Sequence, residues 1–142
     1  MKPYVRDEVV KEFKFISKAM IDEKKDTMSK IFYYSAAYGA ADRLLKMEFD
    51  SDLNIINSIL FLSYRQLLDR AQAFAKGDRI IPIDNEIINK IAEGLNEIAS
   101  SLEMDYSPYD ALKKIMKYTF ASTGPGHYMV LRGKLVLAED KG

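Results

Sequence analysis

Apolar residues recur along the chain at the spacing of helices. Between residues 5 and 24 the apolar positions are three or four residues apart, and lysines occupy the opposite side of the helical wheel. At 100° per residue such positions fall on one stripe, which is typical of an amphipathic helix with one buried face. The pattern therefore predicts a first helix over residues 5–24. Its apolar positions are Val5, Val9, Phe13, Ile16 and Met20.

The second segment, residues 27–48, is apolar on nearly every side of the wheel. Asp26 or Thr27 can accept a hydrogen bond from the first free backbone N–H groups and so begin the helix. Because a helix that is apolar all round has to be covered on several sides, we expect this segment to be the central helix. Its two faces are formed by Ile31, Tyr34, Ala37, Tyr38, Ala41, Leu44 and Leu45, and by Phe32, Ala36, Gly39, Ala40 and Met47.

Three further helices follow in the sequence. Residues 51–76 repeat apolar side chains at near-heptad steps and stop before Gly77, a residue that favours the end of a helix. Residues 85–103 divide cleanly into an isoleucine-rich face and an acidic face. Residues 108–122 begin after Ser107, where serine at the N-cap and proline at the first helical position form a strong helix start.

The C-terminal residues change from helical to extended periodicity. The segment Gly-Pro-Gly at residues 124–126 ends the last helix, since proline and glycine suit the centre of a type II turn. Two apolar runs around Arg-Gly then predict a β-hairpin over residues 127–138. We therefore expect a mainly all-α protein, a five-helix bundle in one domain over residues 1–142 with a small C-terminal β-hairpin. Whether residues 79–83 add a strand to the hairpin stays open.

Composition excludes several classes of protein. The chain has 142 residues, 21 basic and 21 acidic side chains, one histidine and no cysteine. A net charge of zero argues against a nucleic-acid partner, because proteins that bind nucleic acid usually carry a basic surplus. Thiolate metal sites, cysteine nucleophiles and sites with two imidazoles are excluded. We therefore expect no metal, no cofactor and no catalytic set of residues; a metal held only by carboxylates, such as Mg²⁺, is the minor alternative that stays open.

The sequence carries no pattern for secretion or membrane insertion. The first eight residues are charged and lack the apolar core of a signal peptide. The longest apolar stretch, residues 55–62, is interrupted by polar residues and is far shorter than the roughly 20 residues that a span needs. We expect a cytoplasmic protein that does not enter a membrane.

Candidate ligand-binding residues lie on the second and third helices. Tyr34 and Tyr38 could line a pocket for a planar ligand, although aromatic core residues with satisfied hydroxyl groups are the simpler interpretation. Arg70 flanks the apolar face of the third helix, where it could hold an anion or a carboxylate. Alternatively its apolar stem lies on the protein while the guanidinium stays in water.

The single histidine follows a glycine-rich turn. Gly124 and Gly126 precede His127, and glycine allows the backbone to approach a ligand closely. The simpler interpretation is a helix stop, a turn and a strand whose first residue is histidine. This segment and the two tyrosines could contribute to one pocket with Arg70.

Association is favoured over catalysis as the function. The second helix and the hairpin carry more apolar surface than one small bundle can cover. We expect a non-catalytic helical bundle that acts through self-association or protein–protein interaction, most simply as a homodimer. The alternative is a small-molecule-binding protein or enzyme with a pocket near Tyr34, Tyr38, Arg70 and the Gly124–His127 loop. The hairpin residues expected at the dimer interface are Tyr128, Val130, Leu131, Leu135 and Leu137.

Overall fold

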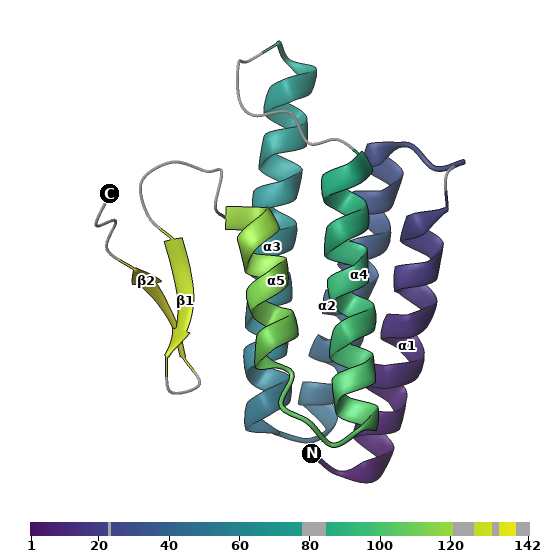
Figure 1. The fold of residues 1–142 in the computed structure, drawn as a ribbon, viewed down its shortest axis with the longest axis vertical. Helices are drawn as coiled ribbons and strands as arrows, with labels where there is room; N and C mark the ends of the chain where they lie inside the picture. Colours follow the sequence, from purple (N-terminus) through teal and green to yellow (C-terminus); the bar gives the residue numbers. More distant parts are fainter. Residues whose placement is uncertain (23, 78–84, 121–126, 132–133, 139–142) are drawn as a thin grey trace.

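Five helices make up most of the described part of the chain (Figure 1). The structure is a computed structural model that describes residues 1–22, 24–77, 85–120, 127–131 and 134–138. The five predicted helices and the all-helical class are confirmed, and the predicted ends agree to within one helical turn. The helices are α1 Pro3–Ile21, α2 Thr27–Met47, α3 Ser51–Ala75, α4 Asn85–Glu103 and α5 Tyr109–Phe120.

Local signals explain where the helices begin and end. The carboxylates of Asp26 and Asp50 each accept a hydrogen bond from the backbone N–H three residues later, at 2.7 and 2.9 Å. Each bond satisfies a donor that has no partner inside the helix. The Ser107 hydroxyl accepts a hydrogen bond from the Tyr109 N–H at 3.3 Å, in agreement with the predicted start of α5. After α3, Gly77 has a φ of 84°, which glycine adopts without strain.

The helices form a ring of neighbours. α1 packs against α2 and α4, α4 also packs against α5, and α3 closes the ring between α2 and α5. Consecutive helices run in opposite directions (Figure 1). A ring with an odd number of such helices must contain one parallel pair of neighbours, and this pair is α3 and α5. α2 and α4 also touch each other across the ring.

The core lies inside the ring and is made from one stripe of each helix. α1 buries all five of its predicted apolar positions, and α4 buries its isoleucine and leucine face from Ile88 to Leu102. α4 and α5 come close at Gly94, where a side chain would meet Ile115. Within the described residues, none of the helices is long and apolar enough to cross a membrane.

The prediction that the second helix is central is wrong. The inner face of α2 is buried, as expected, but Phe32 is 54% exposed and Met47 is 68% exposed on the opposite face. Ala36 and Gly39 between them are exposed too. The reason is the ring, in which each helix covers its neighbours with its inner face alone. Packing of the core therefore does not explain why the outer face of α2 is apolar.

Two short strands follow the helices. β1 His127–Leu131 and β2 Lys134–Ala138 pair antiparallel, with Leu131 opposite Lys134. The backbone of β1 lies beside α5, and that of β2 beside α3. The side chains of both strands lie outside the described part of the structure, as does the possible strand at residues 79–83.

Candidate functional site

An exposed stripe that is apolar except for Arg43 follows the outer side of α2. Phe32, Ala36, Gly39, Arg43 and Met47 recur at steps of four, three, four and four residues, and all of them are exposed. We call these five residues the α2 outer face. Its middle is formed by the two smallest residues, Ala36 and Gly39, and a Cβ at Gly39 would meet no described atom within 4 Å. Larger side chains lie at both ends of this open centre.

Charged groups lie both on and beside the α2 outer face. The Arg43 guanidinium lies 3.9 Å from the carboxylate of Glu12 on α1. Beside Phe32, the exposed ring of Tyr33 has the Lys25 ammonium 5.0 Å from its centroid. An apolar strip with a charged rim is typical of surfaces that contact another protein.

Tyr38, a predicted pocket residue, lies where α2 meets α3. It is half-buried, and its ring centroid is 5.1 Å from that of Phe61 on α3. The Arg65 guanidinium lies 5.9 Å from the Phe61 ring. This aromatic pair packs α2 against α3 at the edge of the core, which is a structural role.

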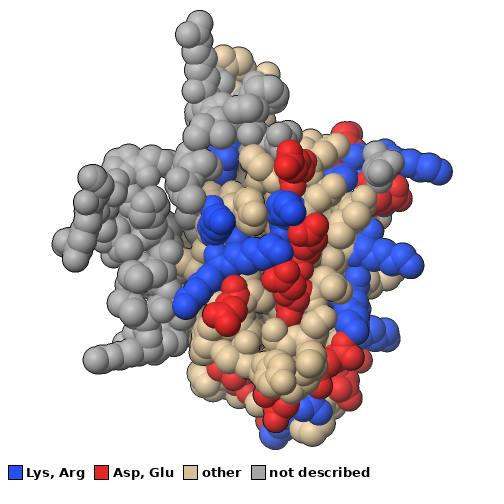
Figure 2. All heavy atoms as spheres, in the orientation of Figure 1, with Lys and Arg blue, Asp and Glu red and all other residues tan. Residues whose placement is uncertain are grey.

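The surface over α4 is charged. Figure 2 shows a band of acidic side chains there, with basic side chains on either side. Lys114 of α5 lies 2.6 Å from Glu97 and 3.6 Å from Glu93, and Lys14 of α1 pairs with Glu103. The hydrogen bond to Glu97 is the main reason why the pKa of Lys114 is raised. A groove of about 530 Å³ lies between α1 and α4. Its lining includes two lysines and two glutamates, Lys14, Lys18, Glu93 and Glu97, so it carries no net charge.

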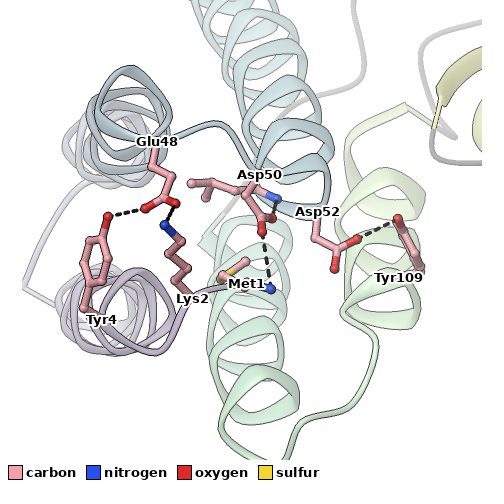
Figure 3. Close-up of polar contacts among 8 residues, drawn as sticks. Met1, Lys2, Tyr4, Glu48, Asp50, Asp52 and Tyr109 are labelled. Carbon is pink, nitrogen blue, oxygen red and sulfur yellow. Dashed lines mark hydrogen bonds and ion pairs between the residues drawn. The ribbon is translucent and has the colours of Figure 1, made fainter.

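A second polar cluster lies where the chain passes from α2 to α3 (Figure 3). Glu48 accepts a hydrogen bond from the Tyr4 hydroxyl and pairs with the Lys2 ammonium. The hydrogen bond from Lys2 is the largest of the effects that lower the pKa of Glu48. Nearby, the Tyr109 hydroxyl donates to Asp52 at 3.2 Å. These carboxylates already have donors, so the cluster fits a role in tying α1 to α2, and α3 to α5.

Tyr34, the other predicted pocket tyrosine, is fully buried. Its hydroxyl is a neighbour of the Ser63 hydroxyl on α3, but neither group forms a hydrogen bond of normal geometry within the described residues. Burial raises the pKa of Tyr34, and the neighbouring Ser63 acts in the opposite direction with a smaller effect. The pair leaves two polar atoms in the interior without partners, which is rare in folded proteins.

Arg70 is buried. The alternative from the sequence, in which its guanidinium stays in water, is therefore wrong. The residue is 4% exposed, and its Nη1 donates to the Thr119 carbonyl oxygen at 3.0 Å. Burial lowers the pKa of Arg70. The structure thus brings Arg70 and Tyr34 into the interior and leaves Tyr38 near the surface.

The remaining predicted pocket residues lie outside the described part of the chain. These are Gly124, Gly126 and the side chain of His127. Sequence reasoning missed Lys30, which is 1% exposed and donates from Nζ to Oδ1 of Asn89 on α4 at 3.1 Å. Lys30 lies one turn before Tyr34 and therefore on the buried stripe of α2. This four-residue spacing is the sequence feature that could have indicated its burial.

Neither a metal centre nor a relative points to an activity. In the described ranges, no three histidine, aspartate or glutamate residues lie together in a way that could hold a metal ion. Comparisons of the chain with protein-family models, with curated proteins and with solved structures give no match.

Proposed function

We propose that this protein is a non-catalytic helical bundle that acts by self-association, and that two copies meet through the α2 outer face. The exposure of Phe32, Ala36 and Gly39 on one helix carries the proposal. Burial of such apolar surface against a partner is the main driving force of protein association. The face has no catalytic group, so contact is the activity that it can support.

The order of residues along α2 fits an antiparallel copy of the same helix. With a two-fold axis between Ala36 and Gly39, Ala36 of one copy faces Gly39 of the other. Small residues opposite each other let two helix backbones approach closely. The same register places Phe32 opposite Arg43 of the second copy, where the guanidinium can lie over the ring. One patch thus supplies both halves of the contact, as a two-fold dimer requires.

The hairpin is a second proposed contact between copies. A two-stranded hairpin is only marginally stable in water and needs a surface to pack on. Through Tyr128, Val130, Leu131, Leu135 and Leu137 it would extend the dimer contact beyond α2. A cytoplasmic location and the lack of a nucleic-acid partner belong to the same proposal, on the grounds of sequence and charge alone.

Light scattering coupled to size-exclusion chromatography tests the proposal. At tens of micromolar we expect twice the chain mass of 16.2 kDa. Ala36→Glu places a charge in the centre of the α2 outer face and should give a monomer with an unchanged helical circular dichroism spectrum. Phe15→Glu is the matched control, because Phe15 of α1 is 68% exposed and lies outside this face.

Three results would contradict the proposal or move the contact. A wild-type monomer at this concentration refutes self-association. Dissociation by Phe15→Glu with a stable Ala36→Glu dimer would place the interface on α1. If a chain that ends at Ser122 is monomeric while Ala36→Glu stays dimeric, the hairpin alone forms the contact.

A further inference from the structure

Four antiparallel or neighbouring helices each place a buried or half-buried polar residue near the same end of the bundle. Lys30 of α2 donates to Asn89 of α4 at 3.1 Å, and Arg70 of α3 donates to the backbone of Thr119 of α5 at 3.0 Å. Lys30 is 1% exposed, Arg70 is 4% exposed, Thr119 is fully buried and Asn89 is half-buried. The interior of a small bundle normally holds apolar side chains, so this concentration of polar groups calls for an explanation.

The contact between α4 and α5 places two of these residues at the same position along the bundle axis. The two helices are antiparallel neighbours, and Gly94 faces Ile115. Thr119 lies one turn beyond Ile115, and Asn89 lies a little over one turn before Gly94. Thr119 and Asn89 are therefore level along the bundle axis.

The same reasoning applies to α2 and α3. These helices are also antiparallel, and Tyr34 is a neighbour of Ser63. Lys30 lies one turn from Tyr34, and Arg70 lies two turns from Ser63 in the same direction. The two cations are therefore within about one turn of each other along the axis.

Arg70 keeps one edge of its guanidinium without a partner. Its Nε and Nη2 are buried and have no hydrogen bond within the described residues, while Nη1 is bound to Thr119. Nε–H and Nη2–H lie on the same edge, and together they can bind two oxygens of one carboxylate or phosphate group. The Thr119 hydroxyl is also buried without a partner. Three buried polar groups, the Arg70 Nε–H, the Arg70 Nη2–H and the Thr119 hydroxyl, therefore have no hydrogen-bond partner among the described residues.

These four residues carry positive charge without a paired carboxylate. Among the described residues, no acidic side chain forms an ion pair with Lys30 or Arg70. The hydrogen bonds from the Lys24 N–H and the Lys25 ammonium are the main effects that lower the pKa of Asp22, and the charge of Lys30 is the smallest effect in that direction. Buried cations without a counter-charge are costly, and a bound anion would remove that cost.

We propose that Lys30, Arg70, Asn89 and Thr119 form an oxyanion site between four helices. The Arg70 edge holds two oxygens of a phosphate or carboxylate group, free or carried by a small molecule. The Lys30 ammonium, held in place by Asn89, supplies its remaining N–H donors, and the Thr119 hydroxyl adds a hydrogen bond. This site goes beyond association through the α2 outer face and does not depend on it.

The arginine Nε–H resonances of the full-length protein test the site at the atom concerned. Inorganic phosphate and, separately, acetate are titrated at constant ionic strength against chloride. We expect the Arg70 Nε–H resonance to shift saturably and the melting temperature to rise. Arg70→Lys keeps the charge but removes the two-donor edge, so it should weaken binding roughly tenfold or more. Arg65→Lys is the matched control, since Arg65 is exposed on the same helix, and it should bind as the wild type does.

The titrations also identify the ligand group and show how the proposal fails. A tighter response to phosphate assigns a phosphoryl ligand, and a tighter response to acetate assigns a carboxylate. If the Arg70 resonance moves with neither anion, or moves equally with chloride, the proposal is overturned and water satisfies the buried groups. Should Arg70→Lys fail to fold, Lys30→Gln takes its place, and unchanged affinity in that variant also overturns the site.

Discussion

Replacement of Gly94 by alanine tests how closely α4 and α5 pack. A Cβ at Gly94 would lie 2.6 Å from Cγ1 and 3.3 Å from Cδ1 of Ile115. The first distance is too short for two carbon atoms. Ile115 cannot turn away easily, because the χ1 angle of a β-branched residue is nearly fixed in a helix. The helices must separate, or Ile115 must take a strained rotamer.

Two opposing effects determine the change in the free energy of unfolding. Alanine is favoured over glycine inside a helix by about 1 kcal/mol, whereas an extra methyl group in a packed core costs about 1–3 kcal/mol. Since the nearest atom, Cγ1, can move away only if the restricted χ1 angle of Ile115 changes, we expect a cost near the upper end and a net loss of about 1–2 kcal/mol. At Gly39 no described atom lies within 4 Å of such a Cβ. Gly39→Ala should therefore stabilise α2 by about 1 kcal/mol.

Chemical denaturation followed by circular dichroism measures both changes, at a protein concentration low enough to limit association through the α2 outer face. Ile115→Ala removes the conflicting atoms, and in that background Gly94→Ala should become stabilising. The four proteins form a double-mutant cycle that isolates the contact. If Gly94→Ala stabilises the wild type as much as Gly39→Ala does, α4 and α5 are not in close contact and the reasoning fails.

Three further predictions follow from single side chains. Ala41→Leu should destabilise the protein by about 1–3 kcal/mol, because Ala41 is fully buried. Lys18→Ala should change the stability little, because Lys18 is exposed. Equal effects of the two substitutions in chemical denaturation would contradict the assigned inner face of α2. The Ser29 N–H lowers the pKa of Asp26 below its unfolded value, so the cap stabilises above the unfolded pKa and loses its effect as pH falls through the folded pKa. The melting temperature of Asp26→Ala should therefore lie below that of the wild type at neutral pH and converge with it in acid, and a constant difference would exclude this cause. Arg70→Met should leave the urea midpoint unchanged or raise it in buffer without oxyanions, and a large decrease would show that the buried charge is already compensated.

The helices could be predicted from sequence because their signals are local. The stripe of α1 and the start of α5 at Ser107 depend on spacing and on residues next to the helix end. The order of the helices around the ring could not be predicted, because it depends on contacts between distant segments. A periodic pattern indicates that a face is apolar, but not which helix covers it.

Adjacent residues of α2 show this limit. Ile31 and Phe32 are both large and apolar, yet Ile31 is fully buried and Phe32 is exposed. The ring decides between them, since it leaves the outer face of α2 without a neighbour. The candidate oxyanion site shows the reverse case. Arg70 could be suspected from its place beside an apolar face, but the burial of Lys30 depends on α4, which brings Asn89 to it.

The parallel contact between α3 and α5 has a consequence for the rate of folding. Short connections join α2 to α3 and α4 to α5, so these antiparallel pairs can form from nearby residues. Closure of the ring instead brings together residues far apart in the chain: Arg70 and Thr119 are 49 positions apart, and Ser17 and Ala92 are 75 apart. The chain loses the entropy of these long loops before the contacts can repay it. We therefore expect that docking of α1 on α4 and of α5 on α3 limits the folding rate. This bundle should fold more slowly than one in which only consecutive helices touch.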